Sequence, residues 1–153
     1  MTLTDLIYRT RLYTRDNNSY MFTDGMITLF LNEAIDRVRQ YPHFTQMSYL
    51  NFASDEPKFI PVQYHYMLAL FASARCFEHD ERFYEAADRR NEFEQLLGDF
   101  INEVQSGNIP ILDEEGNEID DVTHTVDYVT DDYYKPKSKI KIVEVEEDDD
   151  TVL

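Results

Sequence analysis

Acidic, histidine and cysteine side chains are the groups that could do chemistry in this chain, and they lie closest together in the EHDE stretch, residues 78–81. Cys76 lies two residues before this stretch. Carboxylates and an imidazole could ligate a metal or transfer protons, and a thiol could act as a nucleophile. None of the four histidines belongs to an HExxH or HxH pattern, and one cysteine cannot form CxxC. The pattern therefore favours a polar turn with a buried, inert thiol before it, and a small helical enzyme or metal carrier is the alternative.

Two other acidic patterns come close to metal sites and depart from them. Residues 113–118 resemble the start of an EF-hand loop, but the glycine falls at loop position 4 and His124 stands where the final glutamate belongs. Glu33, Glu78 and Glu92 fall on different predicted helices, as in di-iron bundles, yet no Glu-x-x-His pattern accompanies them. The chain also lacks a phosphate-binding glycine loop and a nucleophile elbow. We therefore predict no catalytic residues, no metal and no cofactor.

The elements that would position these groups are predicted to be helices over the first two thirds of the chain. The first runs from Leu3 to about Arg15, and Thr2 can cap it with Asp5 in the capping-box position. The second begins after Thr23 as N-cap and stops before Pro42. Its apolar residues recur at helical spacing and predict one buried stripe. These residues are Ile27, Phe30, Leu31, Ala34, Ile35 and Val38.

The third and fourth helices differ in character. The third starts at Pro61, and its apolar residues surround most of its circumference, which is typical of a central helix. The fourth is predicted over residues 81–106, with Asp80 as N-cap and Gly107 just past its end. Its predicted apolar face consists of Phe83, Ala86, Ala87, Phe93, Leu97, Phe100, Ile101 and Val104.

The composition changes after Gly107, where helix formers give way to Val, Ile, Thr and Tyr among acids. We predict a helical domain over residues 1–107 and an acidic extended arm with short strands over residues 108–153. Residues 111–120 predict a hairpin around a central glycine. The predicted fold class is mainly α: a four-helix, bundle-like core, a small β-hairpin or loop insertion between helices two and three, and an extended β-rich C-terminal arm.

The charge is strongly acidic and uneven. The net charge is −17. Residues 1–107 contribute −6 and residues 108–153 contribute −11. Binding to nucleic acid by neutralising phosphates is excluded, because that requires lysine and arginine. Such a chain would repel nucleic acid, imitate it or bind a basic partner.

Aromatic side chains are abundant, with 11 Tyr and 10 Phe. They could simply fill the core, or they could contribute to protein–protein surfaces, where aromatics are enriched. For the whole set we predict an oligomer. The candidate contacts between protomers are Tyr64, Tyr66, Phe83 and Tyr84.

Two blocks of sequence resemble the tailed-bacteriophage head–tail connector, or adaptor, proteins. In the first block, Phe22, Thr23 and Asp24 open a helix that continues through Ile27, Phe30, Leu31, Asn32, Ala34 and Val38. In the second, Ile60, Pro61, Tyr64 and His65 precede a helix with Ala74, Phe77 and Glu78 near its end. Together the blocks cover about residues 3–105, and residues 108–153 match no shared pattern.

The resemblance implies a structural virion protein at the head–tail interface, assembled in the host cytoplasm. Members of the family form a ring, typically twelve-fold, under the portal. The ring extends the DNA channel, which double-stranded DNA crosses without specific binding, and offers a platform to the next tail or head-completion protein. We predict no membrane partner, because no apolar run approaches the roughly 18 residues that a membrane span needs.

A strand-like alternation near the C-terminus is the candidate contact with the portal or a neighbouring subunit, because an isolated strand gains its hydrogen bonds by joining another sheet edge. The alternative function is an acidic nucleic-acid mimic that inhibits a host enzyme. The residues of the candidate contact are Lys139, Ile140, Lys141, Ile142, Val143, Glu144 and Val145.

Overall fold

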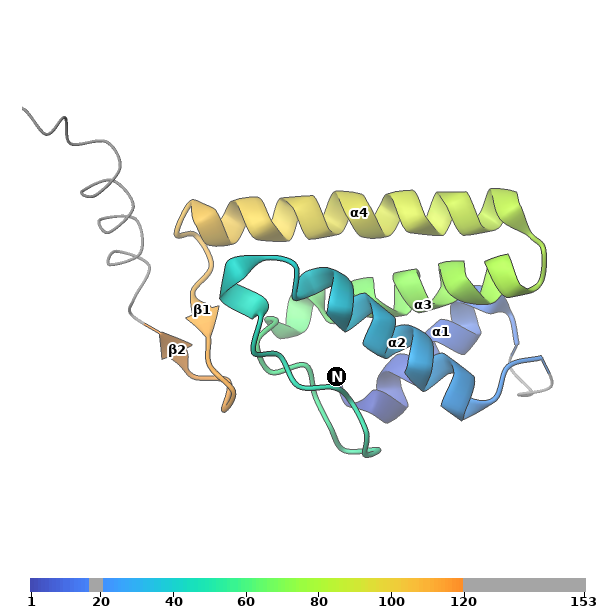
Figure 1. Cartoon of the computed structure of the whole chain (residues 1–153), viewed down its shortest axis with the longest axis horizontal. Helices are drawn as coiled ribbons and strands as arrows, with labels where there is room; N and C mark the ends of the chain where they lie inside the picture. The colour runs from blue at the N-terminus through green and yellow to red at the C-terminus, as the bar shows by residue number, and fades with distance from the viewer. Residues whose placement is uncertain (17–20, 120–153) are drawn as a thin grey trace, which may run out of the picture. The chain divides into compact units, whose positions relative to one another are not determined.

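A computed structural model describes residues 1–16 and 21–119, which all belong to one unit of the chain (Figure 1). The predicted contact at 139–145 lies outside the described residues, as does the rest of the arm from residue 120. The elements are α1 (Leu3–Thr14), α2 (Asp24–Val38), the 3₁₀ helices η1 (Pro42–Phe44) and η2 (Val62–Tyr64), α3 (Tyr66–His79), α4 (Phe83–Gln105), β1 (Ile111–Leu112) and β2 (Glu118–Ile119).

Helix α3 is the centre of this unit, because α1, α2 and α4 all pack against it. Figure 1 shows α4 running alongside α3 in the opposite direction. Met67, Leu68 and Ala72 of α3 have no exposed surface. The predicted central helix is therefore confirmed, and so is the mainly helical fold class.

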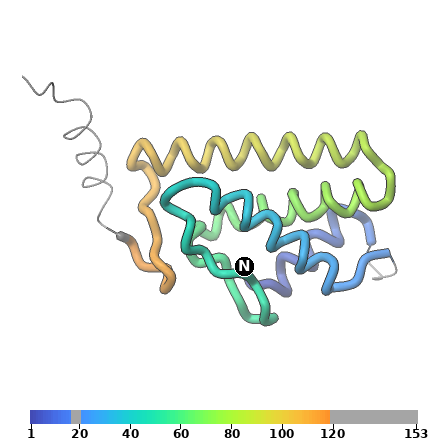
Figure 2. Tube along the Cα trace, in the orientation of Figure 1, coloured from blue at the N-terminus to red at the C-terminus, as the bar shows by residue number. Residues whose placement is uncertain are grey.

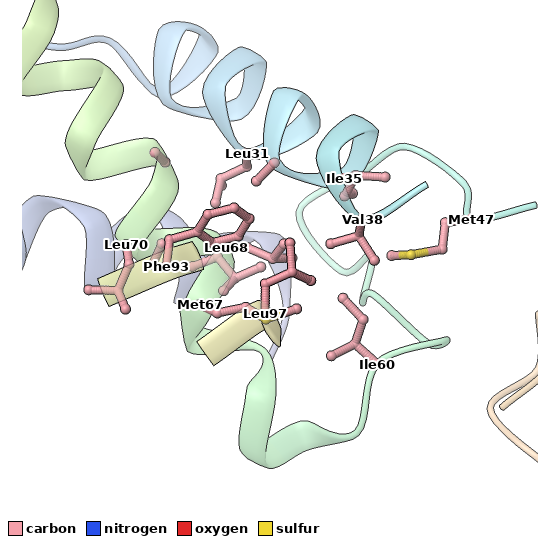
Figure 3. Close-up of a cluster of buried hydrophobic side chains, with 14 of the residues drawn as sticks. Leu31, Ile35, Val38, Met47, Ile60, Met67, Leu68, Leu70, Phe93 and Leu97 are labelled. Atoms are coloured by element: carbon pink, nitrogen blue, oxygen red, sulfur yellow. The ribbon is translucent and has the colours of Figure 1, made fainter. Parts of the chain in front are cut away.

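The core joins all four α-helices to the segment between α2 and α3, and Figure 3 shows the part formed by α2, α3, α4 and that segment. Residues 27–38 of α2 give the predicted apolar stripe, and all six of its members are buried. Met47 and Ile60, which lie in the segment between α2 and α3, are also buried in this core. The labelled side chains in Figure 3 are Leu31, Ile35, Val38, Met47, Ile60, Met67, Leu68, Leu70, Phe93 and Leu97.

Local sequence signals set the ends of the first two helices as predicted. Thr2 and Asp5 form a reciprocal capping box, and the Thr23 hydroxyl accepts a hydrogen bond from the Met26 N–H. Tyr41, the residue before Pro42, has ψ of 137° and lies outside the helical region. These caps satisfy backbone N–H groups that the first turn of a helix leaves unpaired.

The predicted start of the fourth helix is wrong. Asp80 follows the end of α3, and α4 begins at Phe83 with Arg82 before it. Glu81 has a φ of 58°, so the chain reverses through a left-handed residue where the helix was expected to begin. Phe83 is 66% exposed and Ala87 is also exposed, although both were expected on the apolar face. The tube in Figure 2 shows this sharp reversal between α3 and α4.

The third helix also begins later than predicted. Pro61 precedes the 3₁₀ helix η2, and α3 starts only at Tyr66. The insertion between α2 and α3 is an irregular loop with the 3₁₀ helix η1, and no strand occurs among residues 43–60. Of the two predicted alternatives, the loop is therefore the one that the structure has.

The first part of the predicted arm packs on the helical core. Strands β1 and β2 pair antiparallel, with Ile111 opposite Ile119, and Gly116 turns between them with a φ of 84°. This pairing confirms the predicted hairpin. Ile109 and Ile111 are buried with the helices, although they follow the composition change at Gly107.

Candidate interaction surface

The EHDE stretch covers the end of α3 and the polar turn after it, and its Glu78 is held in ion pairs. Glu78 accepts hydrogen bonds from Arg75 at 2.6 Å and from Arg90, and Arg75 also donates to Glu33 at 2.7 Å. His79 packs edge-on against the Phe22 ring, with 6.2 Å between centroids. Glu33 and Glu78 are therefore ion-paired with arginines. Within residues 1–16 and 21–119, no group of side chains could hold a metal ion.

Cys76 is buried on α3, as predicted. Burial raises the pKa of its thiol to about 12, with a further contribution from the negative charge of Asp16. A thiol with this pKa is almost entirely protonated near neutral pH and is a poor nucleophile. The prediction that the chain is not an enzyme stays a prediction.

The four aromatic candidates for protomer contacts lie in two places. Tyr64 and Tyr66 are half-buried against the core; the Tyr64 ring lies 5.0 Å from the Phe100 ring, and the Arg9 guanidinium lies 5.9 Å above the Tyr66 ring. Phe83 and Tyr84 are 66% and 90% exposed at the start of α4. Two of the four candidates therefore pack against the core, and the other two face solvent.

A groove between α1 and α4 is a feature that sequence reasoning missed. Two hollows of about 340 and 310 Å³ share Tyr13, Arg89 and Glu92, so they form one continuous groove, called here the α1–α4 groove. Its floor comes from α3, since Tyr66 and Phe77 line it. The Arg89 guanidinium lies 5.1 Å over the Tyr13 ring. No local pattern could have predicted this groove, because it forms where two helices pack side by side on a third.

Two arginines on the α1 side of this groove differ from the other seven in the chain. Seven of the nine arginines lie within 4.0 Å of a carboxylate. Within the described ranges, Arg9 and Arg15 are the two that have no such ion pair. Both belong to the α1 segment; Arg15 lines the groove, and Arg9 covers the Tyr66 ring in its floor. On the α4 side of the groove, Arg82 and Arg89 pair with Glu85 and Glu92, and Asp88 adds a negative charge. Among the described residues of the groove, positive charge without a carboxylate partner therefore lies on the α1 side alone.

The loop over residues 47–59 is a second recessed surface, and it is firmly anchored. It borders a hollow of about 520 Å³. Asn32 of α2 donates to the Leu50 carbonyl at 3.0 Å and accepts from the Leu50 N–H at 2.9 Å. Asp55 accepts from the N–H groups of Asn51 and Phe52, both at 2.8 Å, which lowers its pKa. These bonds hold Phe52 in place while leaving it 71% exposed.

Replacing Asn32 by aspartate should destabilise the protein by about 1–3 kcal/mol, because the Leu50 carbonyl loses its donor and then faces a carboxylate. The measurement is the free energy of unfolding in urea. Asn91→Asp makes the same chemical change on the exposed surface of α4 and should have little effect. Equal losses in the two variants would contradict the anchoring role of Asn32.

His65 anchors the other end of this loop. It is buried, and its Nε2 donates to the Ile60 carbonyl at 2.6 Å, which leaves Nδ1 to accept from the Met1 amino group at 2.8 Å. Burial lowers the pKa of His65 from its usual 6.5; the Met1 charge lowers it further, and the Ile60 bond and Glu56 oppose the shift. The folded protein therefore holds this ring neutral.

Stability should consequently fall on acidification. The neutral ring contributes fully above pH 6.5, the usual pKa of histidine. The unfolded chain gains a proton first as pH drops, so this contribution is lost between pH 6.5 and the lower folded pKa. We expect His65→Gln, which keeps a donor for the Ile60 carbonyl, to flatten this part of the curve of unfolding free energy against pH. Parallel curves for the two proteins would rule out His65 as the source.

Comparison with known proteins leaves the chain without an assigned family. No protein-family model, no curated protein and no solved structure matches it. Among the helices that the structure describes, none is long and apolar enough to cross a membrane. The resemblance to connector proteins therefore depends on the two sequence blocks alone.

Proposed function

We propose that this chain is a structural subunit of a bacteriophage head–tail connector, forming a ring that binds the portal and receives the next tail or head-completion protein. The observation that carries the proposal is that residues of the resembling blocks make the contacts that join the elements. Thr23 caps α2, Asp24 pairs with Arg11 of α1 at 2.5 Å, and Asn32 and His65 anchor the loop between α2 and α3. The shared pattern thus coincides with the contacts that define this fold.

The charge distribution supports the same proposal. Residues 1–107 keep a net charge of −6 after all of their arginines and their one lysine are counted. A ring with acidic residues along its channel would repel DNA phosphates and let the duplex slide without binding. A channel wall that proved basic or neutral would remove this part of the proposal.

The uncovered aromatic surfaces also suit an assembly subunit. A ring requires two different contact faces on each protomer. The exposed Phe83 and Tyr84 and the α1–α4 groove are two such faces with different chemistry. In this role the chain needs no catalytic centre, metal or cofactor.

Removing the residues after Tyr134 should weaken binding to the portal while leaving the helical unit folded. The deleted segment contains the alternating residues 139–145, which we expect to join a sheet edge of the portal or a neighbouring subunit. The measurement is the mass of complexes formed by the purified chain with the portal assembly of the same virus, together with the helical circular dichroism of the truncated chain.

A full-length variant with residues 139–145 in scrambled order is the matched control, because it keeps the charge and length of the arm. We expect it to bind the portal as weakly as the truncated chain. Binding of the truncated chain at full strength would show that the arm has no part in docking, and a full-length chain that never binds the portal would refute the proposed function itself.

A further inference from the structure

Helix α4 carries two unlike surfaces that are fixed relative to one another. The first is the α1–α4 groove. The second is the turn before α4 with the first residues of that helix, called here the aromatic turn: Asp80, Glu81, Phe83 and Tyr84. Neither Phe83 nor Tyr84 lines the groove.

The aromatic turn is apolar and acidic. Tyr84 is 90% exposed and Phe83 is 66% exposed, and an exposed pair of aromatic rings is typical of a binding hot spot. Asp80 and Glu81 add two negative charges just before these aromatic residues in the chain. Arg82 does not neutralise them, because its guanidinium is bonded to Glu85 at 2.8 Å and lies 4.5 Å over the Phe77 ring.

The groove has the complementary chemistry. Tyr13, Tyr66 and Leu96 line it and are half-buried, so each presents an apolar surface that a partner could cover. On its α1 side, Arg15 lines the groove and Arg9 covers the Tyr66 ring, both without a carboxylate partner among the residues that the structure describes. The α4 side holds the paired Glu85 and Glu92 and the carboxylate of Asp88, so an acidic partner would face the α1 side. Burying an acidic group against such an arginine gives a charge-assisted hydrogen bond, which is stronger than a neutral one.

We infer that the α1–α4 groove receives the aromatic turn of a second copy of this chain, with Phe83 and Tyr84 on the apolar floor and the acids of the turn facing Arg9 and Arg15. A single copy cannot make this contact with itself, because groove and turn are both fixed on α4. This inference deepens the proposed function, and rests on it, by naming the contact between neighbouring ring subunits. Such a head-to-tail contact generates a ring when its rotation closes.

Charge reversal tests the contact directly. Arg15→Glu alone and Glu81→Arg alone should each weaken self-association by about tenfold or more, because each places like charges together. The two changes combined in one chain restore opposite charges and should recover most of the affinity. Lys58→Glu reverses a charge on the 47–59 loop, outside both surfaces, and is the matched control. Analytical ultracentrifugation of the chain, and native mass spectrometry of its complex with the portal, give the readout.

Cysteine cross-linking provides a second measurement that does not depend on altered charge. A chain carrying Tyr84→Cys and Gln95→Cys places one thiol on the turn and one in the groove, while Cys76 stays buried. We expect bismaleimide to join successive copies of this variant into a ladder. A chain with Leu29→Cys in place of Tyr84→Cys exposes a thiol on α2, 58% exposed in the wild type, and should give no ladder.

The outcomes separate this inference from the proposed function. If both charge-reversal variants still form rings on the portal and the Tyr84→Cys variant gives no ladder, the contact is overturned and the connector role stands. Dimers or open filaments that depend on Arg15 and Glu81 would support the contact and overturn the ring. A chain that stays monomeric with and without portal, and gives no ladder, would overturn both.

Discussion

Replacing Arg11 by alanine should destabilise the protein by roughly 3–5 kcal/mol, because the change removes a buried positive charge that pairs with a buried carboxylate. Arg11 is 7% exposed and donates to Asp16 at 3.0 Å and to Asp24 at 2.5 Å. Asp16 in turn accepts from the Phe22 N–H at 3.1 Å. This network joins the end of α1 to the start of α2, so its loss should loosen both helices together.

Arg39→Ala is the control, because it removes the same charge from an exposed ion pair instead of a buried one. Arg39 pairs with Asp36 at 3.4 Å on the surface, where both side chains keep a third or more of their area exposed. An exposed pair of this kind contributes about 1 kcal/mol or less. The measurement is the free energy of unfolding in urea at low and at high salt. Losses of similar size in the two variants would show that the Arg11 network does not stabilise the fold as its burial implies.

The sequence predicted well those elements that depend only on residues close together in the chain. The six-residue stripe of α2 and its Thr23 cap follow from spacing along one helix, and every member is buried as expected. The β1–β2 hairpin follows in the same way from a glycine between two short apolar runs. Such features need only neighbouring residues, so no knowledge of the rest of the fold was required.

The errors occur where tertiary packing outweighs local preference. Asp80 is a good N-cap residue, yet the chain reverses through Glu81 in a left-handed conformation that glycine or asparagine would usually mark. The reversal delays α4 and turns Phe83 outward. Sequence pattern gave Phe83 and Phe93 the same apolar role, but only Phe93 lies deep enough along α4 to reach the core.

The sequence predicted only part of the candidate interaction surface, because the rest of it depends on tertiary packing. Tyr84 was expected at a protomer contact because aromatics gather at interfaces, and the structure leaves it exposed. The importance of Arg9 and Arg15 could not be predicted, since it depends on which other arginines find carboxylates in the folded chain. The net charge of −17 does not show that these two arginines lack a carboxylate partner within the part of the chain that the structure describes.

Replacing Phe100 by alanine should also destabilise the protein by roughly 3–5 kcal/mol, the usual range for truncating a buried phenylalanine. Phe100 has no exposed surface, and its ring lies 5.2 Å from the Phe44 ring and 5.0 Å from the Tyr64 ring. Both partners belong to the 3₁₀ helices at the two ends of the long loop. The variant should therefore lose hydrogen-exchange protection first at η1, η2 and the last turns of α4.

The position of Phe100 also makes the variant a test of where assembly contacts lie. Tyr84 precedes Phe100 by 16 residues, which is about 24 Å along a helix. Damage around Phe100 should leave the aromatic turn in place, although Leu96 of the groove lies only one helical turn before Phe100. The milder Phe100→Leu, which fills more of the cavity and keeps the protein folded, should therefore self-associate as the wild type does. Loss of self-association in folded Phe100→Leu would place the contact between copies at this end of α4, away from the aromatic turn.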